Sequence, residues 1–214
     1  MEGGENKLKD IFSYNVDVNK TAYMNWRTEK HNHIHNMIVL ADGFMESAIM
    51  LAEDVLNDNF NKKADIIIFP ILFNTNHGIE LYLKAITWSL NILMKSEYKI
   101  EGNHDIKQIL STVKSKVRKF EKEKEKKQQF LKLIENLDAY LKELNEKIEK
   151  ADLKKNDKMD FSRYPLTKEY IPHFYIGTFK NVVVDLENFI SRMKEISKNL
   201  NLISCYYLYK FIEP

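Results

Sequence analysis

The stretch that decides the fold is residues 70–95, PILFNTNHGIELYLKAITWSLNILMK, the most hydrophobic part of the chain. Its main apolar residues recur at helical spacing and form one stripe, made of Leu72, Ile79, Leu83, Ile86, Leu90 and Leu93. Tyr82, Ala85 and Trp88 occupy other faces, so little of this helix can face water. Proline is tolerated near a helix start and not in its interior. We therefore predict a core helix from close to Pro70 to about Lys95.

Four further segments show helical periodicity. The first runs from about Ala22 to Leu56, with its stripe at Ile34, Ile38, Ala41, Met45, Ala48, Ala52 and Val55. The others are His104–Val117, an amphipathic helix around Phe130–Ile148, and a last helix over about Thr178–Leu200. Whether the third and fourth helices are continuous through residues 121–127 stays open. We expect an all-α fold, an antiparallel bundle of about five helices.

Outside the bundle, the chain divides into segments of different character. Residues 1–20 are polar and weakly patterned, so we expect a flexible N-terminal arm, followed by a helical bundle over residues 21–200. Residues 201–214 form an apolar tail, which we expect to dock as a short strand or helix. Residues 152–176 are the only long irregular stretch within the bundle, and such stretches are often functional or disordered.

Composition excludes several classes of protein. The 214 residues carry 33 Lys and Arg against 31 Asp and Glu, a net charge of +2, so charge alone does not argue for nucleic-acid binding. One cysteine, Cys205, excludes a disulfide framework and fits a reducing compartment. No uninterrupted apolar run reaches the roughly 18–20 residues that span a bilayer, and the N-terminus lacks a signal-peptide pattern. We expect a cytoplasmic protein without membrane contact.

The most informative polar residues lie on the core helix itself. His77, Glu80 and Lys84 are three and four residues apart, so they share one face of that helix. An unpaired buried charge costs several kcal/mol, so these groups must meet partners or water. Two hypotheses remain open. One is an internal Glu80–Lys84 pair that also holds Arg163, and the other is a polar pocket for a nucleotide or an RNA phosphate.

Two other segments could complete such a pocket. Asn103 or Asp105 can cap the third helix, which places His104 at its start as a packing residue or a proton carrier. Later in the chain, Arg163 and Tyr164 precede a proline, and arginine can hold a carboxylate or phosphate through two parallel hydrogen bonds. If this loop folds over the core helix, Arg163 meets Glu80, either as a structural clamp or as the wall of an active site.

A histidine-rich segment at the start of the first helix is less specific. On a helix, Arg27, His31 and His35 would align at intervals of four, and two histidines so spaced can ligate a metal. No acidic or cysteine partner stands at a recognisable spacing, so a solvated helix start is the preferred interpretation. We expect no metal and no cofactor.

The order of these motifs resembles bacterial proteins of the HEPN-domain superfamily. The matching segments are Ile66–Phe73, then His77–Ala85 of the form His-x-x-Glu-Leu-x-Leu-Lys-Ala, His104–Leu110, and Arg163–Pro165. The resemblance covers about residues 35–200. It implies an antiparallel bundle of four or more helices, often dimeric, and in many members metal-independent RNA cleavage by toxins or antiviral effectors.

The usual catalytic motif of that family does not carry over. That motif is an arginine followed, after four to six residues, by a histidine near the end of a late helix. Here Arg163 stands ten residues before His173, which is too far for the motif. Arg27 and His33 have the spacing of the motif, but they lie at the start of the first helix instead of near the end of a late one. Either catalysis uses His104 with Arg163, or the chain belongs to a binding branch of the family.

The resemblance therefore implies a metal-independent ribonuclease in prokaryotic antiviral defence or a toxin–antitoxin system. His104 and Arg163 are the expected catalytic residues, supported by His77, Glu80, Lys84, Asp105 and Tyr164. The alternative is a non-catalytic helical module that binds a partner protein or a nucleotide. The expected partners are RNA or a nucleotide, a second copy in a homodimer, and a protein encoded in the same operon.

Overall fold

The computed structural model describes residues 9–96, 102–149, 160–167, 169–176, 181–210 and 212. Over these residues it contains six α-helices and no strand. They are α1 (His33–Asn57), α2 (Ala64–Leu93), α3 (Ile106–Phe120), α4 (Lys124–Leu133), α5 (Glu135–Glu149) and α6 (Leu186–Tyr209). Three short 3₁₀ helices accompany them: η1 (Val18–Lys20), η2 (Phe60–Lys62) and η3 (Asp160–Ser162). The prediction of an all-α fold is confirmed.

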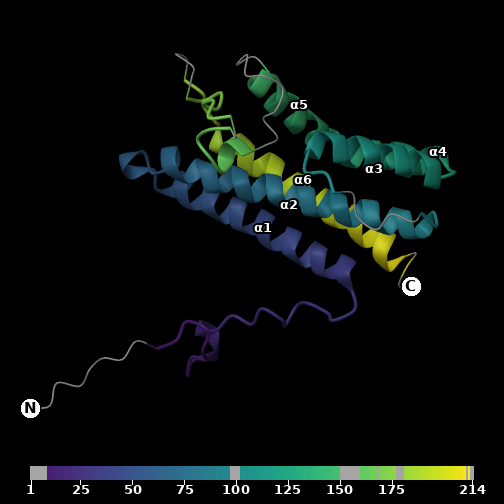
Figure 1. Ribbon diagram of the computed structural model, residues 1–214, viewed down its shortest axis with the longest axis horizontal. Helices are drawn as coiled ribbons and strands as arrows, with labels where there is room; N and C mark the ends of the chain where they lie inside the picture. The colour runs from purple at the N-terminus through teal and green to yellow at the C-terminus, as the bar shows by residue number, and fades with distance from the viewer. Residues whose placement is uncertain are drawn as a thin grey trace, which may run out of the picture.

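Helix α2 is the central rod of the bundle. It contacts α1, α3, α6 and η3, and Figure 1 shows α1, α2 and α6 lying side by side with α3, α4 and α5 beyond them. A short connection over residues 58–63 makes α1 and α2 antiparallel. Half of the residues of α2 are buried, among them Tyr82, Leu83, Ile86 and Leu90, which have no exposed surface. The expectation that little of this helix faces water is therefore correct.

The stripe predicted for α1 is confirmed residue by residue, but the start of the helix is not. All seven of its apolar positions are buried. The helix begins at His33 instead of about Ala22, because Asn32 caps it by accepting a hydrogen bond from the His35 amide at 2.9 Å. Residues 9–27 lie outside the bundle, are almost all exposed, and extend away from the helices in Figure 1.

The predicted start of α2 is also wrong. The helix begins at Ala64 and continues through Pro70. A proline inside a helix leaves the carbonyl four residues earlier without its amide partner. Pro70 and Ile66 both lie on the exposed face, where water can bond to that carbonyl. Ile67 and Ile68 pack against the core from the same turns, which favours a helix here despite the proline.

The later helices differ from the predictions at their ends. Helix α3 begins at Ile106 with Asp105 as its cap, which settles the choice between Asn103 and Asp105. Helices α3 and α4 are not continuous, because the helical conformation is interrupted between Phe120 and Lys124. The single helix expected around residues 130–148 is divided into two helices, α4 and α5, at Ile134. Helix α6 begins at Leu186 and runs to Tyr209, so residues 201–209 continue this helix instead of forming a separate element. Thr178 lies outside the described residues.

Gly78 lets α1 and α2 approach closely, and its replacement by alanine is expected to destabilise the protein. An added Cβ would lie 2.7 Å from Met45 Cγ and 3.2 Å from the Ala41 carbonyl oxygen, both in α1. Overpacking of this kind costs about 1–3 kcal/mol, although alanine is otherwise about 1 kcal/mol better than glycine within a helix. Urea unfolding measures the change.

Gly43 provides the matched control for this prediction. It lies on the exposed side of α1, and no atom comes within 4 Å of an added Cβ. Gly43→Ala is therefore expected to raise the free energy of unfolding by about 0.5–1 kcal/mol. Equal stabilisation by Gly43→Ala and Gly78→Ala would contradict the close approach of the two helices.

Candidate functional site

A cavity of about 430 Å³ lies between α2, the connector before α3, and η3 with the turn that follows it. Helix α2 contributes Phe73, Asn76, His77 and Glu80 to its wall. From the connector comes His104, and from the other side come Ser162, Arg163 and Tyr164. Five of the seven predicted site residues thus line one cavity, although the sequence separates them by up to 87 positions, from His77 to Tyr164.

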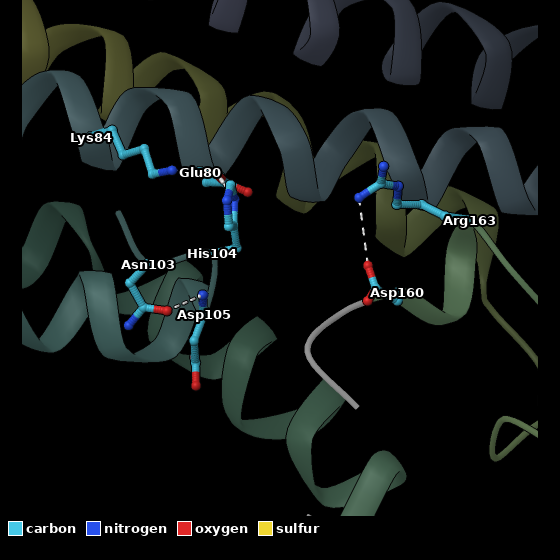
Figure 2. A network of polar contacts seen from close by, with 7 residues as sticks. All are labelled: Glu80, Lys84, Asn103, His104, Asp105, Asp160 and Arg163. Carbon is cyan, nitrogen blue, oxygen red and sulfur yellow. Dashed lines mark hydrogen bonds and ion pairs between the residues drawn. The ribbon is translucent and has the colours of Figure 1, made fainter. Parts of the chain in front are cut away.

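Glu80 holds the centre of the polar network. Its Oε1 lies 2.8 Å from Lys84 Nζ and 2.9 Å from His104 Nδ1. Figure 2 shows these side chains next to one another. The Glu80 and Lys84 side chains are only 13% and 11% exposed, whereas that of His104 is 73% exposed. The four-residue spacing predicted this pair, because it places both side chains on one face of α2. The Glu80–Lys84 part of the first hypothesis is confirmed.

The contact with Glu80 also decides which nitrogen of His104 carries a proton. An ionised carboxylate can only accept a hydrogen bond, so Nδ1 of the imidazole must donate it. In the neutral ring Nε2 is then the unprotonated nitrogen, able to accept a proton from a bound ligand. A carboxylate that orients a histidine in this way is a recurring feature of general-base catalysis.

The expected contact between Glu80 and Arg163 does not form. Arg163 Nη1 instead lies 3.5 Å from Asp160 Oδ1, and Figure 2 shows this pair displaced along α2 from Glu80 and His104. The two side chains are 51% and 38% exposed, and pairs this exposed are worth about 0–1 kcal/mol. Arg163 is therefore not the buried structural clamp that the sequence suggested.

Aromatic rings line the Arg163 side of the cavity. The guanidinium carbon of Arg163 lies 5.6 Å from the ring centroids of both Phe73 and Tyr164. His77 stacks on Phe73 at 5.8 Å and meets the edge of Phe44 at 4.5 Å. This wall combines one cation with flat apolar surfaces, a combination suited to a phosphate and a neighbouring base.

His77 belongs to the aromatic wall and not to the proton-transfer group. Burial lowers its pKa, and the positive charges of Arg163, Lys84 and His104 lower it further, against the opposing effect of Glu80. The ring is therefore neutral at pH 7 and packs as an aromatic side chain.

The remaining predicted residue, Asp105, forms hydrogen bonds that stabilise the backbone at the start of α3. Its side chain accepts a hydrogen bond from the Gln108 amide at 3.1 Å, and its own amide donates to Asn103 Oδ1 at 2.9 Å. These two bonds fix the turn that carries His104 to Glu80 (Figure 2). Asp105 thus positions the connector and does not line the cavity.

Three polar residues of the cavity were missed by the sequence analysis. Asn76, Asp160 and Ser162 line it beside the predicted residues. A signal for Asn76 was present, because it is a polar residue next to His77 on a helix that the sequence marked as buried. Nothing in the sequence distinguishes Ser162 from other loop serines.

No protein-family model, curated protein or solved structure matches this chain.

The other histidines named in the sequence analysis lie elsewhere. Arg27 and His31 precede α1, so they do not align with His35 on a helix. His173 is fully buried and does not line the cavity. Across the described part of the chain, no group of three or more His, Cys, Asp or Glu side chains could hold a metal ion.

Two of the helices, α1 and α2, are long and apolar enough to cross a membrane by length and composition. The buried core helices of soluble proteins share this property, so the finding decides nothing about membrane contact. The cytoplasmic location stays a prediction.

Proposed function

We propose that this protein is a metal-independent ribonuclease of the HEPN type. The observation that carries the proposal is the contact between Glu80 and His104 at the edge of a cavity that also holds Arg163. A base that deprotonates the 2′-hydroxyl and a cation that stabilises charge on the phosphate both promote cleavage of RNA by its own 2′-hydroxyl. The resemblance in motif order supports the same activity, together with a role as a toxin or antiviral effector.

In the proposed reaction, His104 Nε2 takes the proton of a ribose 2′-hydroxyl. The freed oxygen attacks the adjacent phosphorus, and the bond to the 5′ oxygen of the next nucleotide breaks. That oxygen leaves with a proton from solvent, and a 2′,3′-cyclic phosphate remains. Arg163 stabilises the negative charge that builds up on the phosphate oxygens. Glu80 keeps the imidazole oriented, and Lys84 balances the charge of Glu80.

Arg163→Ala tests the role of the cation. Because its ion pair is exposed, the variant should keep the stability of the wild type within about 1 kcal/mol. We expect its rate of RNA cleavage to fall about 100-fold, as when a charge-stabilising donor is removed. Cleavage of a labelled single-stranded RNA in the presence of EDTA measures the rate and tests metal independence at the same time.

Arg118→Ala is the matched control, since Arg118 is an exposed arginine of α3 outside the cavity. It should cleave at the wild-type rate. Loss of activity in EDTA, or equal rates for Arg163→Ala and the wild type, would contradict the proposed mechanism.

The alternative function is a non-catalytic module that binds a nucleotide or a partner protein. The nearly buried Glu80–Lys84 pair is consistent with it, since such a pair can hold a rigid binding site as well as an active site. RNA that binds in the cavity without being cleaved would identify this alternative. The homodimer and a partner encoded in the same operon are proposals that the family resemblance supports, and light scattering and co-purification test them.

A further inference from the structure

Two buried polar atoms of the cavity have no hydrogen-bond partner. Asn76 is only 4% exposed and its Nδ2 is unpaired, and the Oγ of Ser162 is also buried and unpaired. Both residues line the cavity. Burying a donor without an acceptor destabilises the folded protein, so native proteins rarely keep one without reason. A ligand that supplies the missing partners would recover this cost on binding.

The orientation of the Asn76 amide is set by Tyr140. The Tyr140 hydroxyl donates to Asn76 Oδ1 at 2.8 Å. Burial raises the pKa of Tyr140, so its phenol keeps the proton that it donates. With Oδ1 held by Tyr140, the amide has its N–H donors left for a ligand.

The walls of the cavity indicate the class of ligand. Tyr164 is 56% exposed, so a base can stack on its ring, while Arg163 beside it can hold the phosphate. The two unpaired atoms are covered, and a base edge reaches them when a wall side chain moves.

We infer that Asn76 and Ser162 form a nucleobase subsite that prefers a base with a carbonyl oxygen, such as uracil, over adenine. In this subsite Asn76 Nδ2 donates to the base carbonyl, and Ser162 Oγ bonds a second polar atom of the same nucleotide. Adenine has no carbonyl oxygen, and asparagine reads adenine by using its oxygen and nitrogen together. Tyr140 holds that oxygen here. The inference rests on the proposed function, since it assumes that the cavity binds RNA.

Binding of short 2′-O-methyl oligonucleotides tests the inference without cleavage, because the methyl group blocks the attacking oxygen. Fluorescence anisotropy should show tighter binding of oligouridine than of oligoadenosine by the wild-type protein. Asn76→Ala and Ser162→Ala should each weaken oligouridine binding about tenfold, the effect of one lost hydrogen bond. Neither should change the binding of oligoadenosine.

Asn91→Ala and Ser89→Ala are the matched controls. Both residues are fully buried in the same helix α2 and also carry unpaired side-chain atoms, yet neither lines this cavity. They should bind both oligonucleotides as the wild type does. Ser162→Ala removes a single unpaired oxygen, so it should unfold at the wild-type temperature or above, and it decides the question if Asn76→Ala does not fold.

The outcomes separate this inference from the proposed function. Equal binding of the two oligonucleotides by the wild type, or unchanged binding by Ser162→Ala, would overturn the nucleobase subsite even if RNA is cleaved. Absence of both binding and cleavage would overturn the subsite and the ribonuclease together. Uridine-selective binding without cleavage would retain the subsite and remove only the catalytic step.

Discussion

His104→Ala is expected to abolish RNA cleavage and to leave the helical circular dichroism spectrum unchanged. Removing a general base typically slows a reaction by about 10²–10⁴-fold, and with His104 lost no other imidazole of the cavity contacts Glu80. The fold should not suffer, because the His104 side chain is 73% exposed. Cleavage of a labelled RNA by matched amounts of the two proteins measures the loss.

His31→Ala controls for the removal of a histidine as such. His31 is exposed, precedes α1 and does not line the cavity, so its loss should leave cleavage at the wild-type rate. A His104→Ala protein that cleaves as fast as the wild type would remove His104 from the mechanism. The Glu80 contact would then be a structural feature of the connector alone.

Lys84→Met is expected to lower the free energy of unfolding by about 3 kcal/mol, the largest effect on stability expected for the polar network around Glu80. Removing one partner of a buried ion pair leaves the other charge in a poorly solvated site, which costs about 3–5 kcal/mol. His104 Nδ1 still contacts Glu80, which places the expected cost at the lower end of that range. Urea unfolding followed by circular dichroism measures it.

Two further variants test whether the unpaired charge of Glu80 causes the loss of stability. Glu80→Gln combined with Lys84→Met removes the uncompensated charge, so the double variant should be more stable than Lys84→Met alone. Lys194→Met breaks the exposed pair with Glu53 and should change stability by no more than about 1 kcal/mol. If Lys84→Met were as mild as Lys194→Met, Glu80 and Lys84 would not form a buried pair in solution.

The two groups of experiments address different parts of one network. Glu80 contacts the exposed His104 and the buried Lys84 through the same oxygen. Loss of His104 should therefore lower the rate of RNA cleavage without changing the free energy of unfolding. Loss of Lys84 should mainly lower the free energy of unfolding. A variant that changed both properties equally would indicate that the network acts as a single structural unit.

The positions of the helical stripes could be predicted from the sequence, but several helix ends could not. Every predicted apolar position of α1 is buried, because periodicity reports which face meets the core. The start of α2 was missed because local preference argues against a helix through Pro70. Packing of Ile67 and Ile68 against the core outweighs that preference, and only the neighbouring helices reveal it.

The candidate site shows the same division. The pairing of Glu80 with Lys84 follows from a spacing of four within one helix, and this prediction is confirmed. The partner of Arg163 was predicted wrongly, because a long loop can place an arginine against any of several carboxylates. Asp160, three residues away, forms the pair within η3 and its turn.

By itself, the sequence determined the all-α class, the apolar faces of the helices and the polar face of α2, because these depend on residues a few positions apart. Only the tertiary structure decided which distant groups meet: His104 with Glu80, Arg163 with Phe73, and Asn76 with Tyr140. The physical reason is that these contacts depend on how whole helices pack and where loops return. No local spacing encodes that information.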